Sequence, residues 1–493
     1  MAIKAGQILH VANQFVVDRI QTGGPGNLNI PQELVFELGN YQTVGIVRDI
    51  PELSFSLDCL DVGTEVEAVL CGSATPSGDA GGTKYELANY KSVDIISPWK
   101  SPYAGFDIVR GVVVPGLALE SASYRYGLQE NAGEQFSLRG DSIFYVPGTP
   151  WQDIAAGDGV EDEFLFEHGP ATVYTEAGSS VYALSVTVDG SRQTVGDHYT
   201  ETEDGITFLT PPGNGAVISI TYGSAEAVQY TQSGNSPFGA TANDVIHQGV
   251  AVKPAAIRGK DIDVYFSTSV AIGGGVTNKA LTSNVATLTT ASDHGLSAGN
   301  VVTVSGVDAT FDGTYTVVAA PTTTTFTYAK TAADVVSAAD TGTVTRAIEV
   351  RWPDVQSASV EWRVNIEDDM EFGNYRAVAR DFVDVPEVTG TVEIKPRSVE
   401  ALFTRLYQIT GVPADEVIGP QSSVTGALRI ELRNPSTAGA TGVAAGTPLK
   451  TLYIPDARFT LPGFEGQVQQ KVSIPIEFQS DGGLLEIYKG SKP

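Results

Sequence analysis

Hydrophobic and polar residues alternate over short stretches along much of this chain. The clearest case runs from Leu53 to Leu57, where every second residue is apolar. Alternation with period two is typical of a β-strand that buries one face and exposes the other. Similar runs rich in Val, Ile, Thr and aromatic residues occur at 108–114, 134–146 and 261–266, with Gly, Asn and Asp between them. The pattern therefore predicts a mainly β protein.

Two stretches depart from this alternation and have the spacing of a helix. In the first, Thr64 and Glu67 match a capping box, and apolar residues share one face up to Gly72. In the second, Ser398 is a candidate N-cap, and Gly411 ends the pattern. The apolar faces are formed by Val66, Val69 and Leu70 in the first helix and by Val399, Leu402, Phe403 and Leu406 in the second.

A short pattern around these helices occurs twice. Gly39-Asn40-Tyr41 recurs as Gly373-Asn374-Tyr375 at an offset of 334 residues, and the segment 49–52 recurs at 384–387 with an offset of 335. The offset is 333 at the start of the helices and 340 from Asp141 to Asp481. One longer helix explains most of this drift, so we predict two copies of one fold. The residues that mark the repeat, for which we expect a structural role, are Gly39, Asn40, Tyr41, Asp49, Pro51, Glu52, Gly373, Asn374, Tyr375, Asp384, Pro386 and Glu387.

The chain then divides into four units. The first copy occupies residues 1–157, and the second occupies 225–276 and 347–493. Residues 158–224 form a small β domain with an Asp-Gly turn, and the Thr-rich residues 277–346 form a second small, Ig-like β domain inserted in the second copy. The first small domain is expected to be a small β-sandwich or meander, and the second is expected to be a β-sandwich of two sheets with one solvated face.

The charge balance limits the classes of partner. The chain has 30 basic and 58 acidic residues, a formal net charge of −28. A surface that grips nucleic acid needs clustered Lys and Arg, so we expect none here. No apolar run is long enough to span a membrane, and the first residues lack the pattern of a signal peptide. We therefore expect synthesis in the cytoplasm.

Residue types that carry chemistry are sparse and scattered. The five histidines are far apart and none has a ligand spacing, and no nucleophile or phosphate-binding motif is present. We expect no catalytic residue and no cofactor, so the protein is predicted not to be an enzyme. Cys59 and Cys71 are interpreted as reduced core residues, although a bridge between them is possible.

Three further groups of residues remain open to two interpretations. The acidic clusters 161–163 and 367–369 could bind calcium or form solvated turns, and the turn is favoured because the spaced loop pattern is missing. A sugar-binding platform of aromatic residues is conceivable, although core packing explains them equally well. Arginines within the repeats could pair with carboxylates across a subunit contact. The aromatic residues are Tyr182, Tyr199 and Phe326, and the arginines are Arg48, Arg380 and Arg405.

The repeated unit resembles the tail tube proteins of tailed bacteriophages. In the first copy the resemblance is carried by Phe36 to Tyr41 with Asp49 to Glu52, the following strand and helix, and Gly111 to Val114. In the second copy it is carried by Glu371 to Tyr375 and the sequence up to Gly411. The inserted units resemble small β modules of phage structural proteins. The resemblance implies two tube folds, each a β-sandwich or split barrel with one flanking helix.

This family implies a function as well as a fold. Six tube folds form a ring around a channel for DNA, and rings stack into the tail tube. Because this chain carries two copies, the resemblance implies three chains per ring, with pseudo-sixfold symmetry. Expected partners are further copies of the chain, the tape-measure protein and other tail proteins, with DNA only as passing cargo. The expected location is the tail of the virion.

A different function remains open for the two small domains. A tail-tip or fibre-like protein could use them to recognise a host by binding cell-surface carbohydrate. Removal of residues 159–223 and 277–346 would separate the two hypotheses, since a tube should assemble without them.

Overall fold

The computed structural model is mainly β, with 63% strand and 4% helix, as the alternating pattern predicts. The repeat residues 39–41, 49 and 373–375 and the second predicted helix lie outside the described part of the chain. The structure describes residues 11–12, 15–16, 20–26, 28–29, 32–36, 43–48, 51–60, 63–73, 79–100, 108–176, 179–224, 257, 259–369, 377, 379–398, 425–434, 446–460 and 473–492.

The first copy builds two sheets that share one long strand, β9. The first half of β9 pairs with β8 and β11, and its second half pairs with β10. Gly116 lies between the two halves at φ +61°, a conformation that permits a sharp bend without a side-chain clash. The strands are β1 (Val11–Ala12), β2 (Phe15–Val16), β3 (Ile20–Pro25), β4 (Gln32–Phe36), β5 (Thr43–Arg48), β6 (Leu53–Cys59), β7 (Lys84–Glu86), β8 (Val93–Lys100), β9 (Ile108–Gly127), β10 (Gly133–Gly140) and β11 (Phe144–Val146).

A short α-helix, α1 (Glu65–Leu70), packs its buried residues into the apolar core of this copy. The predicted position is confirmed, and Gly72 ends the helix at φ +83°. The predicted capping box is wrong, because the side chain of Thr64 makes no capping hydrogen bond. Glu67 instead turns into the core, where its side chain is fully buried. Tertiary partners therefore override the local capping pattern.

The second copy repeats this arrangement of strands. β27 pairs with β30, β30 with β33, and β33 with β32, as β3 pairs with β6, β6 with β10, and β10 with β9. A separate hairpin joins β28 to β29. The strands are β27 (Val355–Arg363), β28 (Ile366–Asp369), β29 (Ala379–Phe382), β30 (Glu387–Ile394), β31 (Thr425–Arg433), β32 (Pro448–Thr460), β33 (Ile474–Ser480) and β34 (Glu486–Lys489).

The two copies also share the same register. The sequence offset of 335 relates the strand pair β3–β6 to β27–β30, and both pairs slip by one residue after their first partners. Such a slip moves every following side chain to the other face, so a shared slip keeps the same faces buried in both copies. Equivalent pairs are Ile20–Cys59 and Val355–Ile394, Cys59–Glu134 and Ile394–Ile474, and Leu119–Leu138 and Phe459–Phe478.

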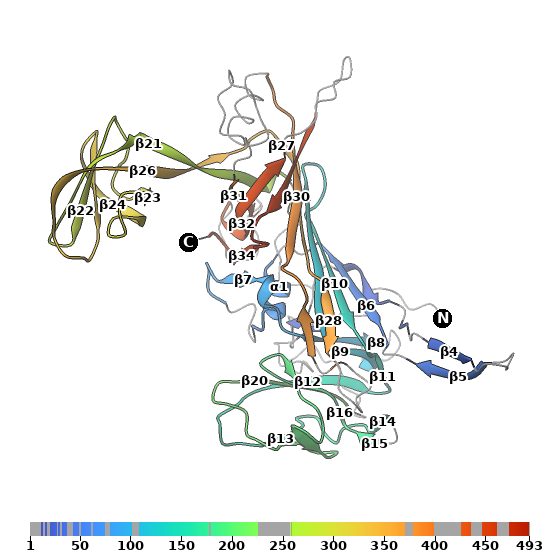
Figure 1. Cartoon of the computed structure of the whole chain (residues 1–493). Helices are drawn as coiled ribbons and strands as arrows, with labels where there is room; N and C mark the ends of the chain where they lie inside the picture. The colour runs from blue at the N-terminus through green and yellow to red at the C-terminus, as the bar shows by residue number, and fades with distance from the viewer. Residues whose placement is uncertain are drawn as a thin grey trace.

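The sequence offset between equivalent residues of the two copies changes abruptly near the start of each copy, and one insertion accounts for this change. Ala12 pairs with Phe15, and their counterparts Phe266 and Val350 also pair. The sequence offset is 254 at Ala12 and 335 at Phe15, so the second copy has 81 additional residues between the two strands of this pair. The long strands β21 (Ile262–Thr282) and β26 (Val335–Arg351) carry this insertion away from the body (Figure 1).

The inserted unit is a closed six-stranded barrel. Its strands pair in the ring β21–β22–β25–β24–β23–β26 and back to β21, whereas the sequence predicted two separate sheets. Closure leaves no free sheet edge, and a core of its own fills the interior. The remaining strands are β22 (Val285–Thr290), β23 (Val301–Ser305), β24 (Gly313–Thr322) and β25 (Thr325–Ala329).

The other small unit joins the two copies and lies below the body in Figure 1. Its four-stranded sheet begins with β12, which pairs with β20, so the strand pairing extends this unit back to Thr149 from the predicted boundary at 158. No helix in the described part of the chain is long and apolar enough to cross a membrane. The strands are β12 (Thr149–Ala156), β13 (Glu163–Leu165), β14 (Tyr174–Glu176), β15 (Ser179–Val181), β16 (Ala183–Val188), β17 (Ser191–Arg192), β18 (Tyr199–Glu201), β19 (Gly205–Phe208) and β20 (Val217–Ser224).

Candidate functional site: the joint between the copies and the joined sheet

The two copies are joined edge to edge through β9 and β27. These strands pair antiparallel from Ser121–Arg363 to Gly127–Ser357, so that one sheet runs through β3, β6, β10, β9, β27, β30, β33 and β32. We call this the joined sheet. One of its outer strands, β3, pairs only with β6 among the described residues. An unpaired strand edge is a ready surface for adding another chain.

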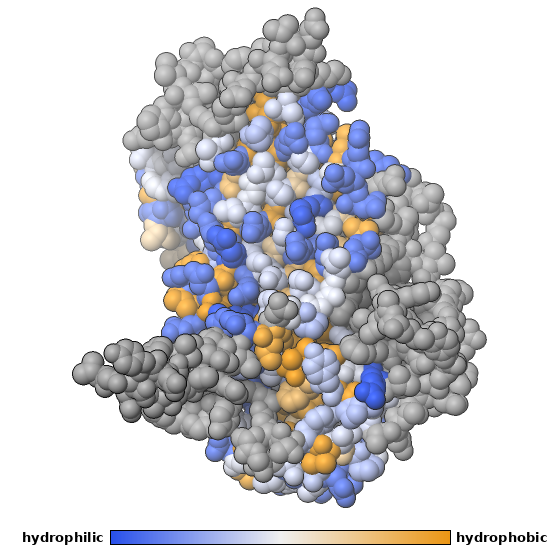
Figure 2. Space-filling model, turned by 90° about the vertical axis from the view of Figure 1, so that its right-hand side faces the viewer, coloured by the Kyte–Doolittle hydropathy of each residue, from blue (hydrophilic) through white to orange (hydrophobic). Residues whose placement is uncertain are grey.

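One face of the joined sheet is apolar and packs into the core, and the other is polar. The polar face is rich in hydroxyl groups, and Figure 2 shows weakly polar residues gathered along the middle of this side of the molecule, with strongly hydrophilic ones among them. Its residues are Ser54, Ser56, Asp58, Ser121, Ser123, Arg125, Gln135, Ser137, Arg139, Ser357, Ser359, Glu361, Arg363, Glu387, Thr389, Thr391, Glu393, Glu477 and Gln479, each half-buried or exposed.

The arginines on this polar face are held by neighbours. Arg139 donates to Asp368 at 3.0 Å, and Arg363 donates to Glu387 at 3.2 Å. Arg125 donates to the amide oxygen of Gln135 at 3.0 Å. Phosphate groups would have to displace these partners, so the face suits a surface that nucleic acid passes without strong binding.

A buried ion cluster holds the second copy against the first. Lys450 on β32 is fully buried, and its ammonium group donates to both carboxylate oxygens of Glu134 at 2.7 and 2.8 Å. It also contacts Glu67 on α1, which accepts a hydrogen bond from Tyr124 at 3.0 Å. Burial alone would lower the pKa of Lys450, but the two carboxylates outweigh burial and hold the pKa above its ordinary value. The lysine is therefore charged in this pocket.

A second cluster connects the first copy, the second copy and the small unit. Arg380 donates to Asp141 and Asp368, each at 2.8 Å, and to the carbonyl oxygen of Gly116 at 2.6 Å. Arg192 of the small unit lies 3.7 Å from Asp141. The expectation that Arg380 pairs across a subunit contact is thus corrected, because its partners are within the chain. The acidic segment 367–369 supplies one of them.

A cleft of about 510 Å³ opens beside this second cluster. It is lined by residues of all three units, including Lys91, Arg192 and Phe382. The rings of Tyr90 and Phe382 pack in a tilted arrangement with their centroids 5.1 Å apart, and burial raises the pKa of Tyr90 to about 12. The walls combine aromatic and cationic groups.

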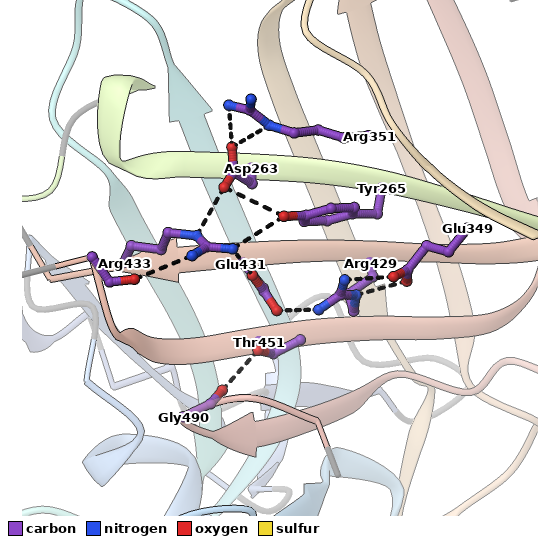
Figure 3. A network of polar contacts seen from close by, with 10 residues as sticks. Asp263, Tyr265, Glu349, Arg351, Arg429, Glu431, Arg433, Thr451 and Gly490 are labelled. Carbon is purple, nitrogen blue, oxygen red and sulfur yellow. Dashed lines mark hydrogen bonds and ion pairs between the residues drawn. The ribbon is translucent and has the colours of Figure 1, made fainter. Parts of the chain in front are cut away.

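The outer face of the second copy carries a charged network on β21, β26 and β31 (Figure 3). Arg429 donates to Glu349, with bonds at 2.6 and 2.8 Å, and its guanidinium stacks on Tyr265 at 4.1 Å. The counterpart of Arg429 in the first copy is Ile96, which is fully buried. There the small unit covers the sheet, for example through a hydrogen bond of 2.8 Å from Thr221 to Asp94. The copies have therefore diverged where one is covered and the other faces solvent.

The described residues of the predicted repeat signature begin the two equivalent strands. Pro51 and Glu52 precede β6, and Asp384, Pro386 and Glu387 lead into β30. Glu52 exchanges backbone hydrogen bonds of 2.7 and 2.8 Å with Asn29. Asp384 accepts a side-chain hydrogen bond from Asn365 at 3.0 Å. The remaining signature residues, Gly39, Asn40, Tyr41, Asp49, Gly373, Asn374 and Tyr375, lie outside the described residues, as do Arg405 and the side chain of Arg48.

Other candidate residues lie in the cores or on the surface. Tyr199 and Phe326 are buried, and Tyr182 packs against the core of its unit, so the proposed sugar platform is not formed by these three. Cys59 and Cys71 are free thiols, and burial raises the pKa of Cys71 to about 12. Within the described ranges, no group of three or more His, Cys, Asp or Glu residues could hold a metal ion. Sequence reasoning missed Lys450, because nothing in its neighbourhood of the chain marks it as buried.

Comparison with known proteins adds no identity. No model of a known protein family matches the chain, and no curated protein matches it with significant similarity.

Proposed function

We propose that this chain is a structural protein that assembles into stacked rings and forms the tail tube of a bacteriophage. The observation that carries the proposal is the joint between β9 and β27. In the order of the joined sheet, β9 is the outermost strand of the first copy, and β27 is the outermost strand on the opposite side of the second copy. The two copies therefore meet through different edges, which is a head-to-tail contact. Head-to-tail contacts propagate until they close a ring or form a filament.

The free end of the joined sheet favours continuation of the same contact between chains. β3 is the counterpart of β27, since both begin equivalent pairings at Ile20 and Val355. β27 has β9 on its other edge, whereas β3 has no second strand partner among the described residues. A second copy of this chain is the proposed partner, because it carries β32, the counterpart of the strand β9 with which β27 pairs.

The number of chains follows from the duplication. If a ring contains six copies, three chains close it with pseudo-sixfold symmetry. The polar face of the joined sheet would then line the channel, and its hydroxyl groups and its arginines, each already hydrogen-bonded to a neighbour, suit DNA as passing cargo. The barrel and the small unit would lie outside the channel. Tape-measure and other tail proteins are expected partners, and the virion tail is the proposed location.

Electron microscopy of the purified protein in negative stain tests the assembly. Rings or tubes are expected, and a protein that stays monomeric at high concentration would refute the proposal. Native mass spectrometry tests the stoichiometry separately. Three chains per ring are expected, and six would refute the three-chain argument while leaving the tube intact.

A further inference from the structure

The two copies carry equivalent hairpins. β4 and β5 lie between β3 and β6 in the chain, as β28 and β29 lie between β27 and β30. Each hairpin forms a two-stranded sheet of its own. The pair Gln32–Arg48 corresponds to Glu367–Asp381, at offsets of 335 and 333. We call β4–β5 the first hairpin and β28–β29 the second hairpin.

The second hairpin is docked on the first copy. Arg380 of β29 donates to the carboxylate of Asp141 at 2.8 Å and to the carbonyl oxygen of Gly116 at 2.6 Å. In the opposite direction, Arg139 of β10 donates to Asp368 of β28 at 3.0 Å. The side chain of Asp141 has no exposed surface in this contact. The hairpin thus reaches from its own copy across the joint to the neighbouring copy.

The first hairpin has no such contact. Figure 1 shows β4 and β5 projecting away from the sheets of the body. Among the described residues these strands pair only with each other, and β3, which leads into them, has no second neighbouring strand. The docking contact of the second hairpin is therefore present once in the chain, although the chain has two hairpins.

The second copy exposes the surface that corresponds to the occupied one. The positions equivalent to Asp141, Gly116 and Arg139 are Asp481, Asp456 and Gln479, each at an offset of 340. The side chain of Asp481 is 40% exposed and lies 3.1 Å from that of Arg458, which is 50% exposed. Gln479 is exposed as well. Exposed ion pairs contribute little to stability, so Asp481 can accept from another donor at small cost.

The proposed ring brings the first hairpin to this surface. If β3 of one chain pairs with β32 of its neighbour, as β27 pairs with β9, the first hairpin lies against the second copy of that neighbour. We propose that the first hairpin is an interchain contact, which docks at the surface formed by Asp456, Gln479 and Asp481 of the neighbouring chain, as the second hairpin docks on the first copy.

This contact rests on the ring proposed above and names what selects the partner. A strand edge alone can pair with many chains. A hairpin that must fit a particular surface at the same time restricts pairing to another copy of this chain. Two contacts with one neighbour also strengthen each other, because the second forms within the complex that the first has made.

Shortening the first hairpin tests its role. Replacing residues 33–47 by Asn-Gly leaves a tight turn between the paired residues Gln32 and Arg48. The variant should fold normally, because the removed strands pair with no other described strand. It should raise the protein concentration needed for ring formation by roughly tenfold or more. Circular dichroism and thermal melting check the fold, and analytical ultracentrifugation measures assembly. Rings at the wild-type concentration would overturn the role of the hairpin and leave the ring proposal standing.

Asp481→Arg tests the receiving surface. A carboxylate accepts hydrogen bonds at this position in the first copy, whereas an arginine side chain has no acceptor. The variant should fold normally and impair ring formation by a similar factor. Glu349→Arg is the matched control, since Glu349 is also 40% exposed and pairs with Arg429, but on the outer face. Assembly of Asp481→Arg like that of the wild type would overturn the assigned surface.

Mixing the two variants tests the direction of the contact. The shortened chain keeps the receiving surface, and the Asp481→Arg chain keeps the first hairpin, so together they can form one joint but no closed ring. Native mass spectrometry should show a 1:1 heterodimer at concentrations where each variant alone is monomeric. Absence of the heterodimer would overturn the pairing of this hairpin with this surface. A wild-type chain that forms no rings would refute the proposed function itself, so the two failures are distinguishable.

Discussion

Lys450 shows how much one residue contributes to holding the copies together. Its charge is balanced by Glu67 and Glu134 in a pocket without solvent exposure. Removing one partner of a buried ion cluster leaves uncompensated charge in a medium that solvates it poorly. Loss of Lys450 alone should therefore weaken the packing of the second copy against the first.

Lys450→Met should reduce the free energy of unfolding by about 3–5 kcal/mol, because two buried carboxylates lose their cation. Urea unfolding followed by tryptophan fluorescence measures the change. The matched control is Lys84→Met, whose ammonium pairs with Glu86 and Glu486 at the surface and should cost no more than about 1 kcal/mol. Equal losses in both variants would contradict a special role for Lys450.

Gly390 is a second position where a small change in one residue should affect stability. A β-carbon there would clash with the carbonyl oxygen of Ser359 on β27 and with the ring of Phe478 on β33. Gly390→Ala should therefore destabilise the protein by about 1–3 kcal/mol through overpacking. Gly81→Ala is the control, since nothing lies within 4 Å of its added carbon. A Gly390→Ala variant with an unchanged urea midpoint would show that the sheet yields easily at this point.

At the scale of elements, the sequence predicted the local strands better than it predicted which distant strands and side chains they contact. The alternation at Leu53 to Leu57 identifies β6 and its buried face because periodicity is a local property. Sequence could not show that β9 changes partners at Gly116, since a bend depends on strands far away in the chain. Closure of the barrel was missed for the same reason. The role of Glu67 was misread because its partners, Lys450 and Tyr124, are distant in sequence.

The barrel should be removable as a unit. Its core is separate from that of the body, and β21 and β26 connect the two. Replacing residues 273–343 by an Asn-Gly turn beyond the Ile272–Val344 pair would leave a simple hairpin, equivalent to the strand pair β1–β2 of the first copy. Calorimetry should show the thermal transition of the body unchanged, and electron microscopy should show intact rings. Loss of folding in this variant would mean that the barrel stabilises the body.

At the scale of the whole molecule, the net charge opposes assembly. Each chain carries a formal charge of −28, so neighbouring chains repel one another at low ionic strength. Salt screens this repulsion over a Debye length of about 8–10 Å near physiological concentration. Ring formation should therefore increase between about 0.02 and 0.2 M salt, as measured by sedimentation. Rings that dissociate as salt is added would indicate that exposed ion pairs dominate the contact instead.

The covalent link between the two copies has a consequence for counting. In the proposed ring, every second joint would be formed inside a chain, where the partner is always at hand, so only half of the joints would depend on concentration. A ring built from whole chains also contains an even number of copies. Rings of five or seven copies, which small errors in joint angle could otherwise produce, would leave one copy protruding and the circle open. For the proposed ring, the duplication would therefore act as a parity constraint, which removes the nearest wrong sizes from the set of rings that can close.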